Sequence, residues 1–239
     1  MPLLVHGLLH AAAAGAVDTD ELTLAAEREV ALVVEGELAA VVSTSDAPEA
    51  VPSRANLMAH ARVLERLGEV ATVAPMQFGV IVADHDELAS SVEEQHDRVL
   101  AVLDRLDGQL EFRLRGRYEE DEVVREVVAD DPRALRLRGD DSFDARMELG
   151  ERIVAGIEVR RDLDRAAVLE RLTPHVTDVV VADVAEPLDA FSLSLLVATD
   201  HRGVFDEHLD ELGEELKPRL GLELVGPVPP FSFADTSEA

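Results

Sequence analysis

The densest group of possible metal ligands in the sequence lies between Gly139 and Asp144, where three aspartates stand close together. Carboxylate oxygens are the ligands that Ca²⁺ prefers, so Asp140, Asp141 and Asp144 could contact that ion. The run lacks, however, the spacing of an EF-hand loop and its closing glutamate. A helical pattern begins directly after it, and acidic residues stabilise the positive end of a helix. The sequence therefore favours a helix start, capped by Ser142 or Asp141, over a metal site.

Asp84, His85 and Asp86 form a second group of possible ligands. This group also stands where a helix is expected to begin, and capping of that helix accounts for its residue types. His60 and His96 lie on predicted helices, but a histidine ligand needs partners, and no pair has i, i+4 spacing on one face. We expect both histidines at the boundary of the core with a hydrogen-bond partner, and we expect no metal and no cofactor.

Motifs that mark the common enzyme classes are absent from the sequence. There is no G-x-G-x-x-G after a strand, no G-x-x-x-x-G-K-[ST], no G-x-S-x-G and no H-E-x-x-H. The lack of cysteine removes thiolate nucleophiles, disulfides and cysteine-ligated metals. Acidic residues are so frequent that the proximity of two carboxylates carries no information about general acid and base catalysis. We therefore expect a protein that is not an enzyme.

Acidic residues dominate the electrostatics of the chain. Fifty Asp and Glu residues stand against 22 Lys and Arg residues, which gives a formal net charge of −28. Self-repulsion of this size opposes compaction in dilute buffer, whereas molar salt shortens the Debye length to roughly 3 Å. We interpret the composition, in which Lys217 is the one lysine, as that of a halophile's cytoplasmic protein. The charge also argues against a nucleic-acid partner, and the alternation of Arg113, Arg115 and Arg117 is typical of an amphipathic strand.

Hydropathy gives no sign of a membrane partner. No apolar run approaches the ~20 residues of a membrane span. The first 17 residues lack the basic region of a signal peptide, and His6, Gly7 and His10 interrupt their apolar stretch. We expect a protein that is neither exported nor bound to a membrane.

Hydrophobic periodicity predicts both helices and strands in the first half of the chain. The pattern favours a strand, a short helix capped by Asp18 or Thr19, a hairpin, a second helix, a strand, a further apolar run and a long helix. Their ranges are Leu3 to Leu9, Asp18 to Glu27, Val30 to Val34 with Leu38 to Ser43, Ser53 to Leu67, Val70 to Val73, Val80 to Ala83, and Asp86 to Leu106. We take residues 1–107 as an N-terminal α+β domain.

The second half of the chain follows the order β-α-β-β-α-β. Strands are expected over Leu110 to Tyr118, Val176 to Val184, Phe191 to Thr199 and Leu222 to Val225, and helices over Glu119 to Val128, Phe143 to Leu172 and Gly203 to Leu220. This order is that of the ferredoxin-like split βαβ arrangement. The predicted fold class is thus α+β with two domains, the second being ferredoxin-like over 108–225.

Prolines and phenylalanines set the C-terminal segment apart. Gly226 to Phe233 contains three prolines, which remove backbone donors and exclude a helix or a central strand. We expect residues 226–239 to be an extended segment that docks Phe231 and Phe233 into a groove.

Two segments resemble the signatures of one known family. Val73 to Val80, read as VAPMQFGV, is similar to the LPMRFGT signature of the gas vesicle proteins GvpF and GvpL, and Gly226 to Phe233 is similar to their C-terminal GPWPPYSF. A His-x-x-V-L-E helix from His60 precedes the first segment, and a strand and helix over 193–212 precede the second. Three positions depart from the family pattern, with Gln77 in place of Arg, Val228 in place of Trp and Phe231 in place of Tyr.

The resemblance implies an accessory or minor structural protein of the gas vesicle, of haloarchaeal type, located at the vesicle and in the cytoplasm. Members of this family are expected to act in nucleation and assembly, with the hydrophobic shell protein GvpA and other accessory Gvp proteins as partners. A charged, folded partner would cover the apolar surface of GvpA and prevent its aggregation. A small-molecule-binding regulatory module of ferredoxin-like type is the alternative.

The same resemblance singles out eight positions as protein-binding or domain-docking residues. They are Pro75, Met76, Phe78, Gly79, Pro229, Pro230, Phe231 and Phe233.

Overall fold

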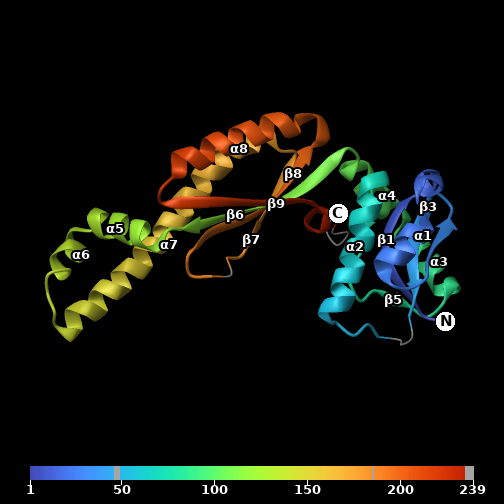
Figure 1. The fold of residues 1–239 in the computed structure, drawn as a ribbon, viewed down its shortest axis with the longest axis horizontal. Helices are drawn as coiled ribbons and strands as arrows, with labels where there is room; N and C mark the ends of the chain where they lie inside the picture. Colours follow the sequence, from blue (N-terminus) through green and yellow to red (C-terminus); the bar gives the residue numbers. More distant parts are fainter. Residues whose placement is uncertain (46–48, 185, 235–239) are drawn as a thin grey trace. The chain divides into compact units, whose positions relative to one another are not determined.

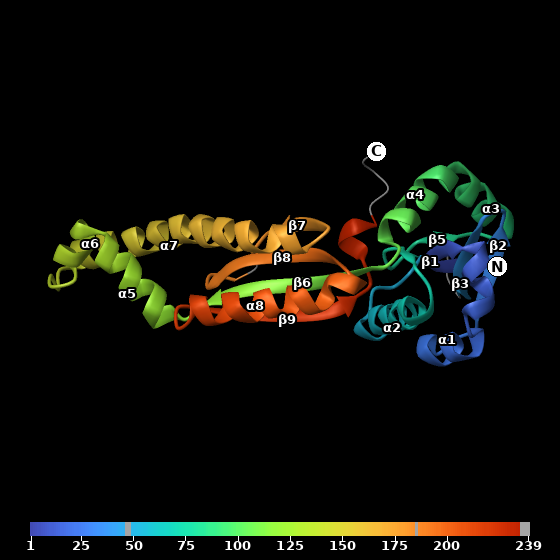
Figure 2. The same cartoon turned by 90° about the horizontal axis from the view of Figure 1, so that it is seen from above.

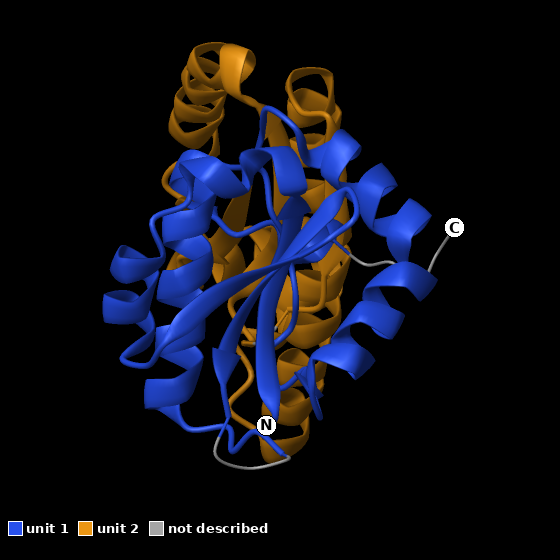
Figure 3. Ribbon diagram, turned by 90° about the vertical axis from the view of Figure 1, so that its right-hand side faces the viewer, with its two compact units in different colours: residues 1–111, 227–239 blue, residues 112–226 orange. Residues whose placement is uncertain are grey.

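The computed structural model describes residues 1–45, 49–184 and 186–234. The chain divides into two compact units, which we call unit 1, residues 1–111 with 227–239, and unit 2, residues 112–226 (Figure 3). The chain passes from unit 1 to unit 2 within one strand, Gln109–Tyr118, and returns within another, Leu220–Val228. The two ends of the chain therefore belong to the same unit.

Unit 1 is a sheet with helices (Figure 1). Its elements are β1 Leu3–His10, a 3₁₀ helix Ala11–Ala16, α1 Thr19–Ala26, β2 Val30–Glu35, β3 Leu38–Thr44, α2 Arg54–Val70, β4 Ala74–Pro75, β5 Ile81–Val82, α3 His85–Glu94 and α4 His96–Leu106. The strand order is β2-β3-β1-β4, and β5 also pairs with β1. The strand β1 is therefore central, which explains why it is buried along nearly its whole length.

Local capping signals set the starts of three helices. The side chains of Asp18, Asp84 and Ser142 accept hydrogen bonds from the first turns of α1, α3 and α7 (Phe143–Leu172). These bonds satisfy backbone donors that have no partner inside the helix. The predicted capping roles of the two aspartate clusters are confirmed, and no group of three or more possible metal ligands occurs among the described residues.

Two expectations for unit 1 are wrong. Residues 70–73 do not form a strand, because α2 continues to Val70 and the next strand, β4, begins only at Ala74. The expected helix over 86–106 is two helices, which meet at Gln95, where φ is −105° and ψ is 4°. This break lets α3 pack against β2 and β5 while α4 packs against β1 and β4, a tertiary preference that helical periodicity does not record.

Unit 2 contains a four-stranded sheet in the order β7-β8-β6-β9. Its elements are β6 Gln109–Tyr118, α5 Glu120–Asp130, α6 Pro132–Leu137, α7 Phe143–Leu172, β7 Asp178–Ala182, β8 Asp189–Ala198, α8 Arg202–Leu216 and β9 Leu220–Val228. The helices α7 and α8 contact each other and the central strand β8. Phe112, Phe191 and Phe205 are among the largest fully buried side chains of this unit. None of the described helices is long and apolar enough to span a bilayer.

Proline chemistry explains most of the differences in unit 2. The helix α6 was not expected, but Asp131 caps it and Pro132 occupies its first turn. A backbone N–H in the first turn has no partner inside the helix, so the missing N–H of proline costs no hydrogen bond there. The helix α8 ends at Leu216 rather than at Leu220, since Pro218 disfavours helical geometry in the residue before it. The strand β7 is shorter than predicted and covers only Asp178–Ala182.

The C-terminal segment is not extended throughout. The strand β9 continues through Pro227 to Val228, which an edge strand tolerates because one side of its backbone has no strand partner. A 3₁₀ turn then covers Phe231–Phe233. The last five residues of the predicted segment 226–239 lie outside the described part of the chain.

Candidate protein-docking site

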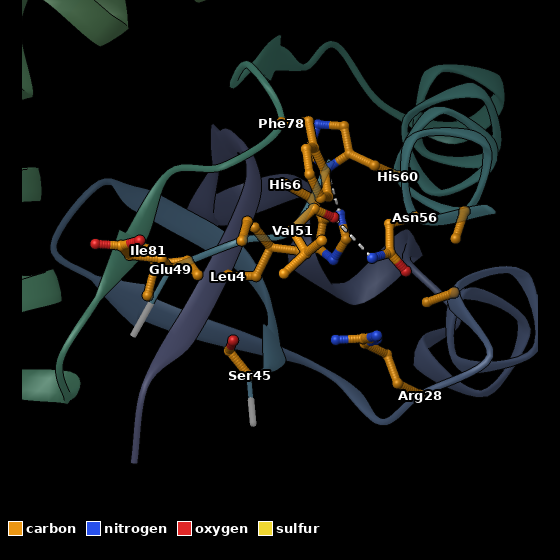
Figure 4. A pocket seen from close by; sticks show the side chains of 13 residues that line it. Leu4, His6, Arg28, Ser45, Glu49, Val51, Asn56, His60, Phe78 and Ile81 are labelled. Atoms are coloured by element: carbon orange, nitrogen blue, oxygen red, sulfur yellow. Dashed lines mark hydrogen bonds between the residues drawn. The ribbon is translucent and has the colours of Figure 1, made fainter. Parts of the chain in front are cut away.

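Four polar groups that are distant in sequence meet in the core of unit 1. His6 on β1 places its Nδ1 2.9 Å from Nδ1 of His60 on α2, and its Nε2 3.0 Å from the hydroxyl of Ser43 on β3. Nε2 of His60 lies 2.8 Å from the carbonyl oxygen of Met76. Figure 4 shows the two histidines side by side, with Phe78 next to them. We call this chain of contacts, Ser43–His6–His60–Met76, the histidine relay.

The direction of every hydrogen bond in the relay follows from its last member. A carbonyl oxygen can only accept, so His60 must donate from Nε2 to Met76. A neutral His60 then carries no proton on Nδ1, which accepts from Nδ1–H of His6. Nε2 of His6 is consequently an acceptor, and the Ser43 hydroxyl donates to it. The relay thus uses all four ring nitrogens with both histidines neutral.

Burial keeps both histidines neutral. His6 is 2% exposed and His60 is 3% exposed. Burial, the neighbouring His60 and the positive charge of Arg28 lower the pKa of His6 to about 3. Burial also lowers the pKa of His60, against an opposing contribution from its hydrogen bond to the Met76 carbonyl. A proton added to either ring would break the donor and acceptor pattern of the relay.

The relay fixes the segment Ala74 to Gly79, which carries four of the eight predicted site residues. The Met76 backbone N–H donates to the carbonyl of His6 at 2.9 Å, so both backbone groups of Met76 are held by histidine residues. Pro75 is paired with Gly7 of β1. The ring of Phe78 stands edge-on to the His60 ring, with 5.7 Å between centroids. The segment is therefore held at its start, while Phe78 remains half-buried.

Gly7 lets the segment approach β1 closely. A Cβ atom at this position would lie 2.9 Å from Cγ2 of Val73 and 3.0 Å from the carbonyl oxygen of Ala74. Distances of this size are shorter than van der Waals contact, so any larger residue would displace the segment. Gly79 adopts a φ of +108°, a conformation that glycine reaches at low cost.

A cavity of about 210 Å³ opens beside the relay. Phe78 and His60 contribute to its wall (Figure 4). The remaining lining residues are mainly apolar, with Arg28, Glu49 and Asn56 as charged or amide groups: Leu4, His6, Ala26, Arg28, Ser45, Glu49, Ala50, Val51, Asn56, Ala59 and Ile81. An apolar hollow with a few polar groups is suited to take up a side chain or a small ligand.

The relay has the order of a serine nucleophile and its base, yet its setting does not suit catalysis. Ser43 is 1% exposed and is not one of the residues that line the cavity. A nucleophile must reach a substrate, and its base is usually oriented by a third group that stabilises the charged form. His60 cannot do so, because it is a neutral ring that offers His6 no negative charge. The relay instead fixes the backbone of Met76, which it binds through the carbonyl and the N–H group.

The C-terminal segment docks onto unit 1 through Phe231 and Phe233. Phe231 packs against a buried apolar cluster that includes Leu64, Leu67 and Val73. Phe233 is 3% exposed, and its carbonyl oxygen accepts a hydrogen bond from the Arg105 guanidinium. These contacts lie within the chain itself.

Ser232, between the two aromatic residues, binds Glu111. Its backbone N–H donates to Oε2 at 3.0 Å and its hydroxyl donates to Oε1 at 2.8 Å. Pro229 and Pro230 precede this contact and are half-buried. The carboxylate is thereby bound by two donors from one residue, which fixes the position of the segment along β6.

The eight predicted positions thus fall into two groups within unit 1. Pro75, Met76, Phe78 and Gly79 lie at the relay and its cavity, and Pro229, Pro230, Phe231 and Phe233 lie in the docked segment. Phe231 of the second group packs against the apolar cluster that contains Val73, which precedes the first group in the chain. Packing inside the chain accounts for Phe233, while Phe78 remains accessible at the cavity.

Two members of the relay were not predicted, and one was placed differently. His6 and Ser43 were not assigned any role. His60 has the expected hydrogen-bond partner, but it is buried rather than at the boundary of the core. His96, in contrast, is 30% exposed and contacts Asp97 at 2.9 Å, as expected for a boundary residue. The available signal for the relay was a histidine inside an otherwise apolar strand.

A sequence profile of the family described as "Gas vesicle synthesis protein GvpL/GvpF" matches residues 5–235. Gas vesicle protein F of a Streptomyces strain is 34% identical over 213 residues, which cover 86% of this chain and 88% of that protein. Gas vesicle protein F of Haloferax mediterranei is 27% identical over 177 residues, which cover 70% of this chain and 82% of that protein.

Two crystal structures share the fold. GvpF from Anabaena sp. PCC7120 matches with a TM-score of 0.80 at 16% identity, covering 98% of this chain and 96% of that one. GvpF from Microcystis aeruginosa matches with a TM-score of 0.77 at 15% identity, covering 98% and 99%. The arrangement of helices and sheets therefore occurs in proteins whose sequences differ at most positions.

Proposed function

Because this chain belongs to the gas vesicle synthesis protein GvpL/GvpF family, we propose that it takes part in gas vesicle nucleation and assembly by binding the hydrophobic shell protein GvpA. Other accessory Gvp proteins would be further partners. In this role the protein acts in the cytoplasm and at the vesicle, and it acts by binding rather than by catalysis.

The observation that carries this proposal is the position of Phe78. The histidine relay holds Met76 through both of its backbone groups, and Phe78 stands two residues further on at the wall of an apolar cavity. A rigid backbone beside an accessible aromatic ring loses little entropy on binding. An apolar side chain of the partner would fill the cavity and stack on this ring.

The charge of the chain supports a protective role. A protein whose apolar face must later meet gas aggregates before assembly, because exposed apolar surface attracts other copies. Bound to a partner of net charge −28, the same surface would be covered and the complex would repel its neighbours. The binding site supplies the contact, and the charged surface keeps the complex dispersed.

We also propose that unit 2 is ferredoxin-like. Its order of elements, with α5 to α7 between the first two strands, reads β-α-β-β-α-β, and the sheet order β7-β8-β6-β9 supports the split βαβ arrangement.

Solubility of GvpA tests the protective role. GvpA would be expressed in a haloarchaeal host alone, with the wild-type chain, or with a Phe78→Asp variant. We expect the wild-type chain to raise the soluble fraction of GvpA severalfold and the variant to fail, because a carboxylate would be placed in an apolar cavity. A soluble fraction that is the same in all three strains would reject the role. Circular dichroism of the purified variant checks that it folds.

A further inference from the structure

One face of α7 is buried at one end of the helix and exposed at the other. Val154 and Leu172 are 18 residues apart, which is five turns at 3.6 residues per turn, so both point to the same side. Leu172 is fully buried, whereas Val154 is 60% exposed. Figure 2 shows why: the first half of α7, together with α5 and α6, extends past the ends of the strands of unit 2. Arg161 and Asp164 interrupt this face in the second half of the helix, where Arg161 binds the Asp189 carbonyl and Asp164 binds Tyr118 and Arg219. The face is apolar again from Ile157 back to Phe143, where the sheet no longer covers it (Figure 2).

The uncovered part of this face has the spacing of a helix-pairing seam. Phe143, Met147, Gly150, Val154 and Ile157 follow one another at intervals of four, three, four and three residues. Phe143 is 75% exposed and Met147 is 52% exposed. Large apolar side chains in such a row are usually covered by another helix. We call these five residues the α7 seam.

A row of acids without partners borders the seam. Asp144, Glu151 and Glu158 recur every seven residues along the edge of the seam, so they occupy the same position in successive heptads. Within the described part of the chain, none of the three forms an ion pair. The neighbouring arginines of α7 are already engaged with carboxylates of the same unit: Arg146 with Asp141, Arg152 with Asp131, and Arg160 with Asp130. Arg161 and Arg117, which share a hollow with Glu158, are likewise engaged, the first with the carbonyls of Asp189 and Pro187 and the second with Glu186. The three acids are therefore left to pair with a positive charge from outside the unit.

The seam ends in a hollow of about 510 Å³. Val154 and Ile157 of the seam line it, together with apolar residues and charged residues of both signs: Val124, Ile153, Pro187 and Leu188, and Arg117, Glu120, Glu158, Arg161 and Glu186. A hollow at the end of an apolar row can take up a large side chain from a docked helix, which anchors the register of the pair.

We propose that the α7 seam binds an amphipathic helix of a partner protein, with Arg or Lys residues in the position that faces Asp144, Glu151 and Glu158. The row of acids indicates a basic partner helix, since charges beside the seam of one helix favour a partner with the opposite charge at the facing positions. This inference concerns unit 2 and does not depend on the proposed function, whose site lies in unit 1.

A second copy of this chain fits the surface less well. In an antiparallel pair of α7 helices the same flank of each helix faces its counterpart, so the two rows of acids would oppose each other. Like charges in that position favour a different partner. In a parallel pair the acids would face the opposite flank, where Arg146 and Arg160 are already paired with Asp141 and Asp130 of their own chain.

Two designed peptides test the charge requirement. Both would be fluorescein-labelled amphipathic helices of three heptads with leucine seams, one with Arg and one with Glu at the flanking positions. Their binding to the full-length protein would be followed by fluorescence anisotropy across a KCl series, limited to the concentrations at which circular dichroism shows the protein to be native. We expect the Arg peptide to bind about tenfold more tightly than the Glu peptide, with a ratio that shrinks as KCl rises. Equal affinities at the lowest KCl concentration that keeps the protein native would overturn the proposal.

Variants on α7 locate the binding surface. Glu151→Arg with Glu158→Arg is expected to reverse the peptide preference, and Val154→Asp is expected to abolish binding. Leu163→Asp is the matched control, because Leu163 is 58% exposed on the same helix but faces the opposite side. Equal losses in Val154→Asp and Leu163→Asp would contradict the assignment, and so would a wild-type dimer in sedimentation equilibrium that Val154→Asp dissociates, because the occupant would then be a second copy.

Discussion

Nδ1 of His6 lies 2.9 Å from Nδ1 of His60, although 54 positions separate the two residues in the sequence. This contact joins the central strand of unit 1 to the helix α2 and, through Nε2 of His60, to the backbone of Met76. One pair of neutral histidines therefore connects the core of the unit to the segment that we propose as a docking site. The predictions below begin with this pair.

Removal of His60 should destabilise unit 1 and loosen the segment after β4. His60→Ala leaves Nδ1–H of His6 and the Met76 carbonyl without partners, and each unsatisfied buried group costs about 1–3 kcal/mol. We expect the free energy of unfolding, from urea titration monitored by circular dichroism, to fall by about 3 kcal/mol. His96→Ala is the control, since His96 is 30% exposed and should change stability by less than about 0.5 kcal/mol. Similar losses in both variants would contradict the relay.

Acid should weaken unit 1 before most carboxylates titrate. The pKa of His6 is about 3 in the folded protein and about 6.5 when unfolded, so below pH 6.5 the unfolded chain binds the extra proton and stability falls. For His6 alone the loss between pH 6.5 and pH 5 is about 1.5 kcal/mol, and it continues toward pH 3. Urea titrations at fixed KCl measure it. His6→Asn should remove this contribution to the slope of unfolding free energy against pH. An unchanged slope in this variant would contradict the buried neutral pair of histidines.

A methyl group at Gly7 should be poorly tolerated. The added Cβ would meet Val73 and the Ala74 carbonyl at about 3 Å, so Gly7→Ala is expected to cost about 1–3 kcal/mol and to shift the segment that follows β4. Gly68→Ala is the matched control on α2, because Gly68 is exposed and nothing lies near its Cβ position. That control should stabilise the protein by up to about 1 kcal/mol, since alanine favours the helix. Thermal unfolding of both variants compares them directly.

Salt should be required for the native state. With 50 acidic and 22 basic residues, repulsion is strong in dilute buffer and is screened in molar KCl. Circular dichroism during dialysis from molar KCl to dilute buffer is expected to show loss of native ellipticity. A spectrum that stays native throughout would refute the salt requirement.

Features that depend on neighbouring residues could be predicted from the sequence, whereas features that depend on distant residues could not. Asp18 and Ser142 were each one of two expected helix caps, and Asp84 belonged to a group expected to cap, because a cap and the backbone N–H donors that it binds lie within three residues. The division of one expected helix at Gln95 was missed, since its cause is packing against different strands. Hydrophobic periodicity shows which face of a helix or strand is buried, but it does not show which other element covers that face.

The site shows the same limit. Pro75, Met76 and Phe78 were found through the resemblance of their segment to a family signature. The relay that fixes this segment was missed, because His6, Ser43 and His60 come from three separate elements. The docking of Phe231 against a buried cluster was expected as a type of contact, but the residues of the groove, such as Leu64, belong to a helix far away in the chain.

The most direct test of the central claim is the capture of GvpA by the tagged full-length chain, co-expressed in a haloarchaeal host and washed in molar KCl. Wild type would be compared with Phe78→Asp at the cavity, with Phe231→Ala/Phe233→Ala in the docked segment, and with Val225→Asp, a control at a half-exposed position of unit 2. We predict capture by wild type and by Val225→Asp, loss in Phe78→Asp, and loss in the double variant, because Phe231 packs against the cluster that includes Val73, directly before the Phe78 segment. A folded wild-type protein that captures no GvpA, or a Phe78→Asp variant that captures as much as wild type, would contradict the account.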